Sequence, residues 1–289
     1  MRLLIAGANG QVGREISRAA SQHTLLTADS CRLDITDADA VKSTVHAFNP
    51  DAVVNAAAYR LVDQAESEPE KAFAVNRDGT ANLAAACNEA GIPLIHLSTD
   101  CVFDGRKQEA YRPEDPAAPL SVYGVSKLAG EQAVRSLCIR HVILRTSWVF
   151  SAHGNNFVKK ILGLAGERDE LRIVADQRGC PTAAPELARA ILHVLQSGTQ
   201  AWGTYHFCQP EPTTWCAFAE AIVAEAKNRH WPLRVRHVLP IATGDYPTPA
   251  QRPANSVMNC SKLETTFGYT IPPWHGSLAE VIDELSARK

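Results

Sequence analysis

A tyrosine and a lysine stand four residues apart in a segment with helical spacing of apolar residues. Tyr123 and Lys127 therefore share one helical face, about 6 Å apart along the axis. A phenol with a pKa near ~10 is a poor acid–base catalyst at neutral pH, but a neighbouring ammonium charge lowers that pKa. The pair predicts a proton donor, Tyr123, activated by Lys127. The spacing is common by chance, so an exposed pair without a role is the alternative.

A hydroxyl and a carboxylate follow a predicted strand over residues 94–98. Thr99 and Asp100 stand at its carboxyl end, the edge at which an open α/β sheet binds its ligand. Thr99 is predicted to donate to a substrate oxygen while Tyr123 delivers the proton, so that both stabilise the developing negative charge. The predicted catalytic set is Thr99, Tyr123 and Lys127. Asp100 is expected to orient the sugar or Tyr123, with a turn as the alternative.

Three glycines follow the first apolar run, residues 3–6, and precede a helical pattern. They allow a tight turn and close approach to a pyrophosphate, and the helix N-terminus offers unpaired N–H groups. The spacing is Gly-x-x-Gly-x-x-Gly rather than G-x-G-x-x-G, but its place between strand and helix indicates a dinucleotide site. The predicted contacts of this loop are Gly7, Asn9, Gly10, Gln11, Val12 and Gly13.

Acidic and basic residues follow the second predicted strand. Asp29 would accept from ribose hydroxyls and favours NAD, whereas Arg32 can pair with the 2′-phosphate of NADP, so both NADPH and NADH stay open as cofactors. Asp34 is either an adenine-side contact or, like Asp37, a helix cap. Asn76 is either a ligand or a buried side chain that satisfies backbone groups. Lys127 is expected to hold the nicotinamide ribose. The other predicted dinucleotide contacts are Ser30, Ile35, Ala56, Ala57, Ala58, Tyr59 and Tyr123.

Composition excludes several classes of partner. The 289 residues are 45% hydrophobic and carry 29 Lys and Arg against 31 Asp and Glu, a net charge of −2, which gives no basic field for nucleic acid or a membrane surface. The apolar start is too short for a signal peptide and no run reaches the ~18 apolar residues of a membrane helix, so a cytoplasmic protein is expected.

The eight cysteines are scattered, without a C-x-x-C pair, and are predicted to be reduced. His206, Cys208 and Cys216 lack a fourth zinc ligand, so we assign no metal to them. Whether Cys101, beside the predicted cleft, is reactive stays open.

Strands and helices alternate up to about residue 145. The expected strands are 3–6, 25–27, 52–55, 94–98 and 142–145, and the expected helices are 12–20, 38–48, 70–90 and 123–137. This order predicts an α/β protein with a Rossmann-type, doubly wound parallel sheet over residues 1–147, which binds NAD(P). Residues 148–289 are expected to be mainly a smaller mixed α/β substrate-binding domain, from which segments can return to the first domain.

The second half shows three helical patterns, at 156–166, 186–195 and 215–228, between loops rich in Gly and Pro. Ser277 and Glu280 have capping-box spacing and predict the start of the last helix. The loops are expected to wall the substrate cleft.

Further motifs run through nearly the whole chain, at residues 10–13, 54–59, 62–66, 98–105, 123–127, 145–149, 154–157, 176–177, 181–182 and 246–253. With them the chain resembles the extended short-chain dehydrogenase/reductases and, within these, the dTDP-4-dehydrorhamnose reductase family. The resemblance implies hydride transfer from NADPH or NADH to C4 of dTDP-4-dehydro-β-L-rhamnose, giving dTDP-β-L-rhamnose, with Tyr123 as proton donor. It implies nucleotide-sugar contacts from Thr99, Asp100, Trp148, Asn156 and Arg252.

The chain departs from this family at two places. Cys101 stands where the family usually has Tyr. Some members are dimers joined through magnesium by acidic side chains. Glu15 fits that pattern, but Glu186 is out of register and Arg189 replaces an acid, so Mg²⁺ stays uncertain and a homodimer stays open.

Two other functions are alternatives for this chain. A dehydratase needs a Glu where this chain has Cys101 and is disfavoured, whereas a related nucleotide-sugar 4-epimerase stays open. The other alternative is a non-catalytic partner such as the regulatory subunit of methionine adenosyltransferase, against which the intact Tyr123 and Lys127 pair argues.

Overall fold

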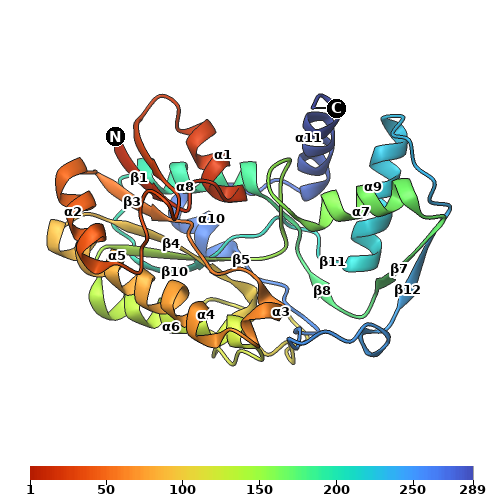
Figure 1. Cartoon of the computed structure of the whole chain (residues 1–289), viewed down its shortest axis with the longest axis horizontal. Helices are drawn as coiled ribbons and strands as arrows, with labels where there is room; N and C mark the ends of the chain where they lie inside the picture. The colour runs from red at the N-terminus through yellow and green to blue at the C-terminus, as the bar shows by residue number, and fades with distance from the viewer. Residues whose placement is uncertain (289) are drawn as a thin grey trace.

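The computed structural model describes residues 1–288 and is built around a six-stranded parallel sheet. The strand order is β10-β5-β4-β3-β1-β2 (Figure 1). The strands are β1 (Arg2–Ala6), β2 (Thr24–Ala28), β3 (Ala52–Asn55), β4 (Leu94–Thr99), β5 (His141–Thr146) and β10 (Gly203–His206). All residues of β3 and β4 are buried, as expected of strands covered on both faces.

Helices cover both faces of this sheet. α1 (Gln11–Ala19) packs against α8 (Ala184–Gln196) on one face, while α2 (Ala38–Phe48), α5 (Thr80–Ala90) and α6 (Val122–Leu137) cover the other (Figure 1). The side chains of β1 alternate between the two cores: Ile5 packs with α1 and α8, and Leu4 and Ala6 pack with α2 and α5. The predicted Rossmann-type sheet is confirmed.

One predicted helix is interrupted. The pattern over residues 70–90 predicted a single helix, but the chain forms α4 (Pro69–Phe73), a π-helical turn η1 (Ala74–Gly79) and then α5. A short helix, α3 (Val62–Ala65), precedes them. The π turn carries Asn76, which is fully buried and bonded to groups outside its own helix. Tertiary contacts therefore override the local periodicity here.

The second half adds short strand pairs and four helices besides α8, and three of the four share a core of their own. β6 (Val149–Phe150) pairs with β9 (Thr182–Ala183), β7 (Glu170–Val174) with β12 (His237–Ile241), and β8 (Arg178–Gly179) with β11 (Thr213–Thr214). The helices of this separate core are α7 (Phe157–Glu167), α9 (Trp215–Asn228) and α11 (Trp274–Ser286), whereas α10 (Ser261–Phe267) packs in the core of the first sheet, beside β10. Two 3₁₀ turns, η2 (Asp100–Val102) and η3 (Thr243–Asp245), follow β4 and β12 respectively.

The predicted capping box is wrong. α11 begins at Trp274, so Ser277 lies inside the helix, where its buried hydroxyl accepts a hydrogen bond from Gln209 at 3.0 Å. β10 and α8 come from the second half of the chain but lie on the first sheet, beside β5 and α1 respectively. The division of functions at residue 147 stays a prediction.

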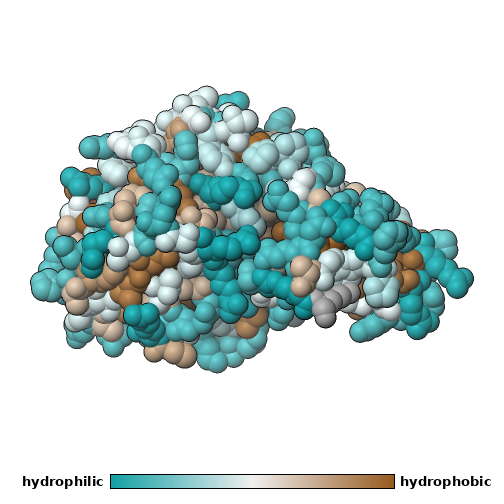
Figure 2. All heavy atoms as spheres, turned by 90° about the horizontal axis from the view of Figure 1, so that it is seen from above, coloured by the Kyte–Doolittle hydropathy of each residue, from teal (hydrophilic) through white to brown (hydrophobic). Residues whose placement is uncertain are grey.

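The face of the molecule seen in Figure 2 is largely hydrophilic, with smaller apolar areas between the polar side chains. Among the helices of residues 1–288, none is long and apolar enough to cross a membrane.

Candidate active site

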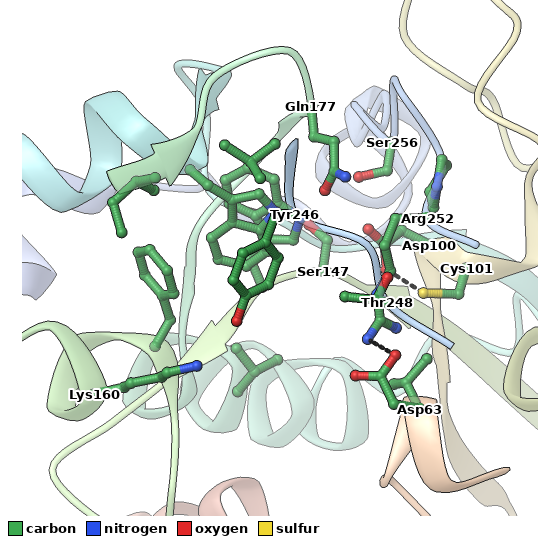
Figure 3. A pocket seen from close by; sticks show the side chains of 18 of the residues that line it. Asp63, Asp100, Cys101, Ser147, Lys160, Gln177, Tyr246, Thr248, Arg252 and Ser256 are labelled. Carbon is green, nitrogen blue, oxygen red and sulfur yellow. Dashed lines mark hydrogen bonds and ion pairs between the residues drawn. The ribbon is translucent and has the colours of Figure 1, made fainter. Parts of the chain in front are cut away.

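A cavity of about 800 Å³ lies at the carboxyl ends of β4 and β5, between the sheet and the second half of the chain. Figure 3 shows its side chains, with Lys160 of α7 on one side of the view and a joined pair, Asp63 and Arg252, on the other. The predicted residues that line it are Thr99, Asp100, Tyr123, Trp148 and Arg252. Residues far apart in the sequence therefore meet around one space large enough for a small-molecule ligand.

The start of α6 places Tyr123 at this cavity. Ser121 caps the helix by accepting from the N–H of Gly124 at 3.2 Å, and the Glu66 carboxylate accepts from the N–H of Val122 at 2.8 Å. A Cβ on Gly124 would stand 2.3 Å from the carbonyl oxygen of Cys101. The glycine thus allows α6 to approach the turn after β4, which brings Tyr123 beside Thr99.

The phenol of Tyr123 adjoins the hydroxyl of Thr99. Burial raises the pKa of Tyr123 above its usual value, while a hydrogen bond with Thr99 and the charge of Arg252 lower it. The sequence-based expectation of a lowered pKa is wrong for this structure, because removal of the ring from water outweighs the neighbouring positive charge. Tyr123 is protonated at neutral pH, which is the form that a proton donor requires.

Lys127 lies one turn further along α6 and is buried. Its ammonium donates to the carbonyl oxygen of Leu97 at 2.6 Å. Burial lowers the pKa of Lys127 to about 8, and the carboxylate of Glu131 opposes this shift. Tyr123 and Lys127 thus lie one turn apart on the same helix, as predicted. The ammonium of Lys127 is hydrogen-bonded to β4, the strand that ends in Thr99.

Glu131, another turn along the same face, was missed in the sequence. Its buried carboxylate accepts from Arg145 at 2.9 and 2.8 Å, from Ser98 at 2.5 Å and from Arg135 at 2.6 Å. The repeated four-residue spacing after Tyr123 and Lys127 was the available signal. These bonds fix α6 to the ends of β4 and β5.

The glycine-rich loop is shaped by close contacts to the end of β3. Gly7 has φ +78°, and a Cβ on it would stand 2.5 Å from the backbone nitrogen of Ala57. A Cβ on Gly13 would stand 2.3 Å from the carbonyl oxygen of Gly7, whereas one on Gly10 would stand 3.3 Å from that oxygen. Gly10 is the N-cap of α1 and offers no side-chain bond to the first N–H groups. This arrangement fits a dinucleotide pyrophosphate.

The residues after β2 are linked to one another and to the glycine-rich loop by hydrogen bonds. Asp29 accepts from the side chain of Asn9 and from the N–H groups of Cys31, at 3.1 Å, and Arg32, at 3.0 Å. Asp37 caps α2 by accepting from Ala40, whereas Asp34 bonds only locally, to Thr36.

The other predicted dinucleotide contacts lie near this loop. Ala56, Ala57, Ala58 and Tyr59 are half-buried at the end of β3, Gln11 and Val12 are half-buried, and Ser30 is exposed. Ile35 is buried in the core, where it packs against Gly79. Its side chain therefore faces the core.

Two predicted asparagine ligands have structural partners. The Asn76 amide bonds to both backbone groups of Tyr59, at 2.9 and 3.1 Å, and to the hydroxyl of Ser126 at 2.9 Å. This matches the alternative of a buried polar side chain that satisfies backbone groups. Asn156 caps α7 and donates to Gln11 at 2.9 Å. It is not among the described residues that line the cavity. The structure thus gives Asn156 a link to the glycine-rich loop, and its expected contact with the substrate stays a prediction.

Aromatic rings line the cavity on the side of the second half. Trp148, with φ +45°, stacks on Trp215 with ring centroids 3.5 Å apart. A Cβ on Gly179 would stand 2.4 Å from the Trp148 ring, so Gly179 is needed for this placement. Trp148 is held rigidly where its ring borders the space.

Polar groups gather on the side of the cavity opposite Lys160 (Figure 3). The Arg252 guanidinium lies 2.9 Å from the carboxylate of Asp63, and Thr99 donates to the buried Asp100 at 3.0 Å. Burial raises the pKa of Asp100, and bonds with Ser256 and Thr99 oppose this shift. Burial also raises the pKa of Cys101 to about 12, so this thiol is protonated and a poor nucleophile at neutral pH.

The acidic and thiol groups considered as metal ligands have other neighbours. Glu15 pairs with Arg18 at 2.8 Å, and Glu186 with Arg189 and Tyr269. The sulfur of Cys208 lies 3.7 Å from that of Cys260. Across residues 1–288, no three His, Cys, Asp or Glu side chains are grouped so as to hold a metal ion.

The fold and this site define the class. A glycine-rich loop after the first strand of a doubly wound parallel sheet, with a Thr, Tyr and Lys set at its carboxyl edge, is the arrangement of the extended short-chain dehydrogenase/reductases. UDP-glucose 4-epimerase from Thermus thermophilus, in complex with NAD, shares this fold with a TM-score of 0.82 at 22% identity. The chain belongs to the family described as the RmlD substrate binding domain, whose model matches residues 1–287.

Several dTDP-4-dehydrorhamnose reductases match this chain over nearly its full length. The dTDP-4-dehydrorhamnose reductase of Sinorhizobium fredii is 44% identical over 98% of this chain and 97% of that protein, and that of Escherichia coli K12 is 40% identical over 99% and 98%. The crystal structure of the reductase from Bacillus anthracis in complex with NADP has a TM-score of 0.92 at 35% identity, covering 98% of this chain and 99% of that one. The family resemblance found in the sequence is confirmed.

Proposed function

We propose that this protein reduces the C4 ketone of dTDP-4-dehydro-β-L-rhamnose to dTDP-β-L-rhamnose with NADPH or NADH. The observation that carries the proposal is the meeting of Thr99 and Tyr123 in one cavity, with Lys127 fixed on the same helix. Family membership over the full chain supports the reductase activity and the cofactor type.

The dinucleotide, when bound, supplies the hydride. Its pyrophosphate would lie on the N–H groups at the start of α1, between Gly7 and Gly13. Lys127 would hold the nicotinamide ribose. Asp29 and Arg32 stand where the adenosine ribose would lie, and the bonds that Asp29 makes to its own loop are compatible with either cofactor.

Tyr123 is proposed to donate the proton to the ketone oxygen, and Thr99 to turn its hydroxyl away from Asp100 and donate a second hydrogen bond to the same oxygen. The two donors face the place where negative charge develops as the hydride arrives, so they stabilise the transition state more than the ground state. The charge of Lys127 eases loss of the proton by Tyr123.

The rest of the cavity is proposed to hold the nucleotide-sugar. Asp100 would accept from sugar hydroxyls, and Trp148 offers a fixed ring face. Arg252, held by Asp63, has the planar cationic group that suits a diphosphate. We propose that residues 148–289 mainly serve this ligand and residues 1–147 the dinucleotide. A homodimer and a cytoplasmic location stay predictions.

The test is to incubate the protein with dTDP-4-dehydrorhamnose and NADPH or NADH, and to follow the loss of absorbance and the product by NMR. Stoichiometric oxidation of the cofactor with formation of dTDP-β-L-rhamnose is the expected result. An epimerase or a regulatory subunit would not oxidise the reduced cofactor in proportion to the sugar. That outcome would overturn the proposal.

A further inference from the structure

Three cysteine side chains meet in the core at the end of β10. Cys208, two residues after that strand, is 3% exposed, and its sulfur lies 3.7 Å from the sulfur of Cys260, the N-cap residue of α10. The thiol of Cys208 also shares a hydrogen bond with that of Cys180, which follows β8. All three are free cysteines in the structure. The fold therefore gathers thiols that are far apart in the sequence.

The backbone holds the sulfurs of Cys208 and Cys260 together. The N–H of Cys208 donates to the sulfur of Cys260 at 3.2 Å, and the carbonyl oxygen of Cys208 lies 3.5 Å from the same sulfur. The carbonyl oxygen of Met258 lies 3.7 Å from one sulfur and 3.9 Å from the other. Because a disulfide bond is about 2.0 Å long, the two sulfurs need to approach by only about 1.7 Å to form one.

The three thiols differ in reactivity. Hydrogen bonds with Cys180 and Cys260, together with burial, raise the pKa of Cys208 well above its usual value, so this thiol is protonated at neutral pH. The hydrogen bond with Cys208 lowers the pKa of Cys180, but Cys180 is only 2% exposed. Cys260 is the half-buried member of the three. We therefore expect a small oxidant from solvent to react with Cys260 first.

We propose that Cys208 and Cys260 are a redox modification site, at which hydrogen peroxide joins the two sulfurs in a reversible disulfide. The thiolate of Cys260 attacks the peroxide: an S–O bond forms, the O–O bond breaks, and the hydroxide that leaves takes up the thiol proton as water. The sulfur of Cys208 then attacks the resulting sulfenic acid: an S–S bond forms, the S–O bond breaks, and the hydroxide leaves with the second thiol proton as water. The two sulfurs together lose the two electrons that reduce the peroxide, and a dithiol returns them.

The disulfide is expected to stabilise the fold, and this expectation does not depend on the proposed function. Because the two sulfurs are already in contact as thiols, the bond should introduce little strain. It closes a loop between residues 52 positions apart, which restricts the unfolded chain. The Tm of the linked protein should therefore be several degrees higher than that of the reduced protein.

The test treats the full-length protein with a small molar excess of hydrogen peroxide at neutral pH and blocks the remaining thiols with N-ethylmaleimide. Mass spectrometry of the peptides should find those of Cys208 and Cys260 joined and lighter by two hydrogen atoms than the free pair. Dithiothreitol should separate them. Thermal melts of the oxidised protein, before and after dithiothreitol, should show the rise in Tm and its reversal.

Two variants serve as controls. Cys260→Ser removes one of the two sulfurs at nearly constant volume, so peroxide should produce neither the linked peptide nor the rise in Tm. Cys31→Ser removes an exposed cysteine outside this group and should form the link as the wild type does.

The absence of a linked peptide in the wild type, a link from Cys208 to Cys180 instead, or a Tm that does not rise on linkage would each overturn the inference. The wild-type peptide map needs no variant, so misfolding of Cys260→Ser would leave the test decisive. Neither measurement uses the sugar. A protein that forms the disulfide but does not reduce the 4-keto sugar would overturn the proposed function alone.

Discussion

The carboxylate of Glu131 and the guanidinium of Arg145 form a two-point ion pair, with N–O distances of 2.9 and 2.8 Å and both side chains almost wholly buried. The pair joins α6, which carries Tyr123 and Lys127, to β5. Burial by itself raises the pKa of Glu131, but its bonds with Arg145 and the other donors bring that pKa below its usual value. The carboxylate therefore stays charged in the interior.

Glu131→Gln should destabilise the protein strongly. Loss of the charge leaves Arg145 buried without a counter-ion, which costs about 3–5 kcal/mol. Urea unfolding followed by circular dichroism measures the change. Glu89→Gln is the control, because Glu89 pairs with Lys42 with both side chains 63% exposed, and its midpoint should not shift. Equal midpoints for the two variants would show that the buried pair adds no stability.

Tyr123→Phe should lose most of the activity and keep the cofactor. Removal of the phenolic hydroxyl takes away the proposed proton donor but leaves the ring and its packing, so kcat should fall about 10²- to 10⁴-fold. NADPH affinity should change little, since the glycine-rich loop is untouched. A steady-state assay with a parallel fluorescence titration checks both. Turnover near the wild-type rate would assign the proton to another group.

The rate should fall as pH rises through about 8. Burial lowers the pKa of Lys127 to about 8, so the ammonium is charged below this pH and neutral above it. In the proposed mechanism, only the charged form eases proton loss by Tyr123. A pH profile of kcat/KM should show this basic limb in the wild type. Lys127→Met should be slower at every pH and lack the limb. A limb that persists in the variant belongs to a different group.

Alanine at two glycines should separate folding from binding. Gly13→Ala forces a Cβ to within 2.3 Å of the backbone oxygen of Gly7 and should lower Tm strongly, whereas Gly10→Ala places its Cβ 3.3 Å from the same oxygen, a tight contact that a small shift relieves, and should lower Tm much less. If the pyrophosphate lies over this loop, Gly10→Ala should still weaken NADPH binding, by about tenfold or more. Thermal melts and NADPH titrations of both variants check this. Unchanged NADPH affinity in Gly10→Ala would place the pyrophosphate elsewhere.

The sequence predicted the parts of the fold that depend on local patterns. The apolar runs of β1, β3 and β4 gave their strands within one residue, and the glycine spacing and the Tyr123 and Lys127 pair were read from the sequence alone. β10 was missed because Gly203–His206 has no apolar run, and it is a strand only through pairing with β5. What makes β10 a strand is therefore a contact between distant parts of the chain, which a local sequence pattern does not show.

The site was harder to predict because its residues depend on partners distant in the sequence. Asn156 has an amide that could bind a ligand. In the structure this amide caps α7 by accepting from the N–H of Lys159, and it donates to Gln11. The pKa of Tyr123 follows burial, which helical spacing does not report. The hydroxyl oxygen of Thr146 is buried without a hydrogen-bond partner within residues 1–288, which only the three-dimensional structure shows.

The place of β10 matters for any attempt to divide this protein. A gene fragment ending at codon 147 would encode Thr99, Tyr123 and Lys127, yet its product would display the bare edge of β5 and the face of α1 that α8 covers. An uncovered parallel strand of this kind recruits other chains. The fragment is therefore expected to aggregate, and the reacting groups depend on the later half of the gene for a soluble scaffold.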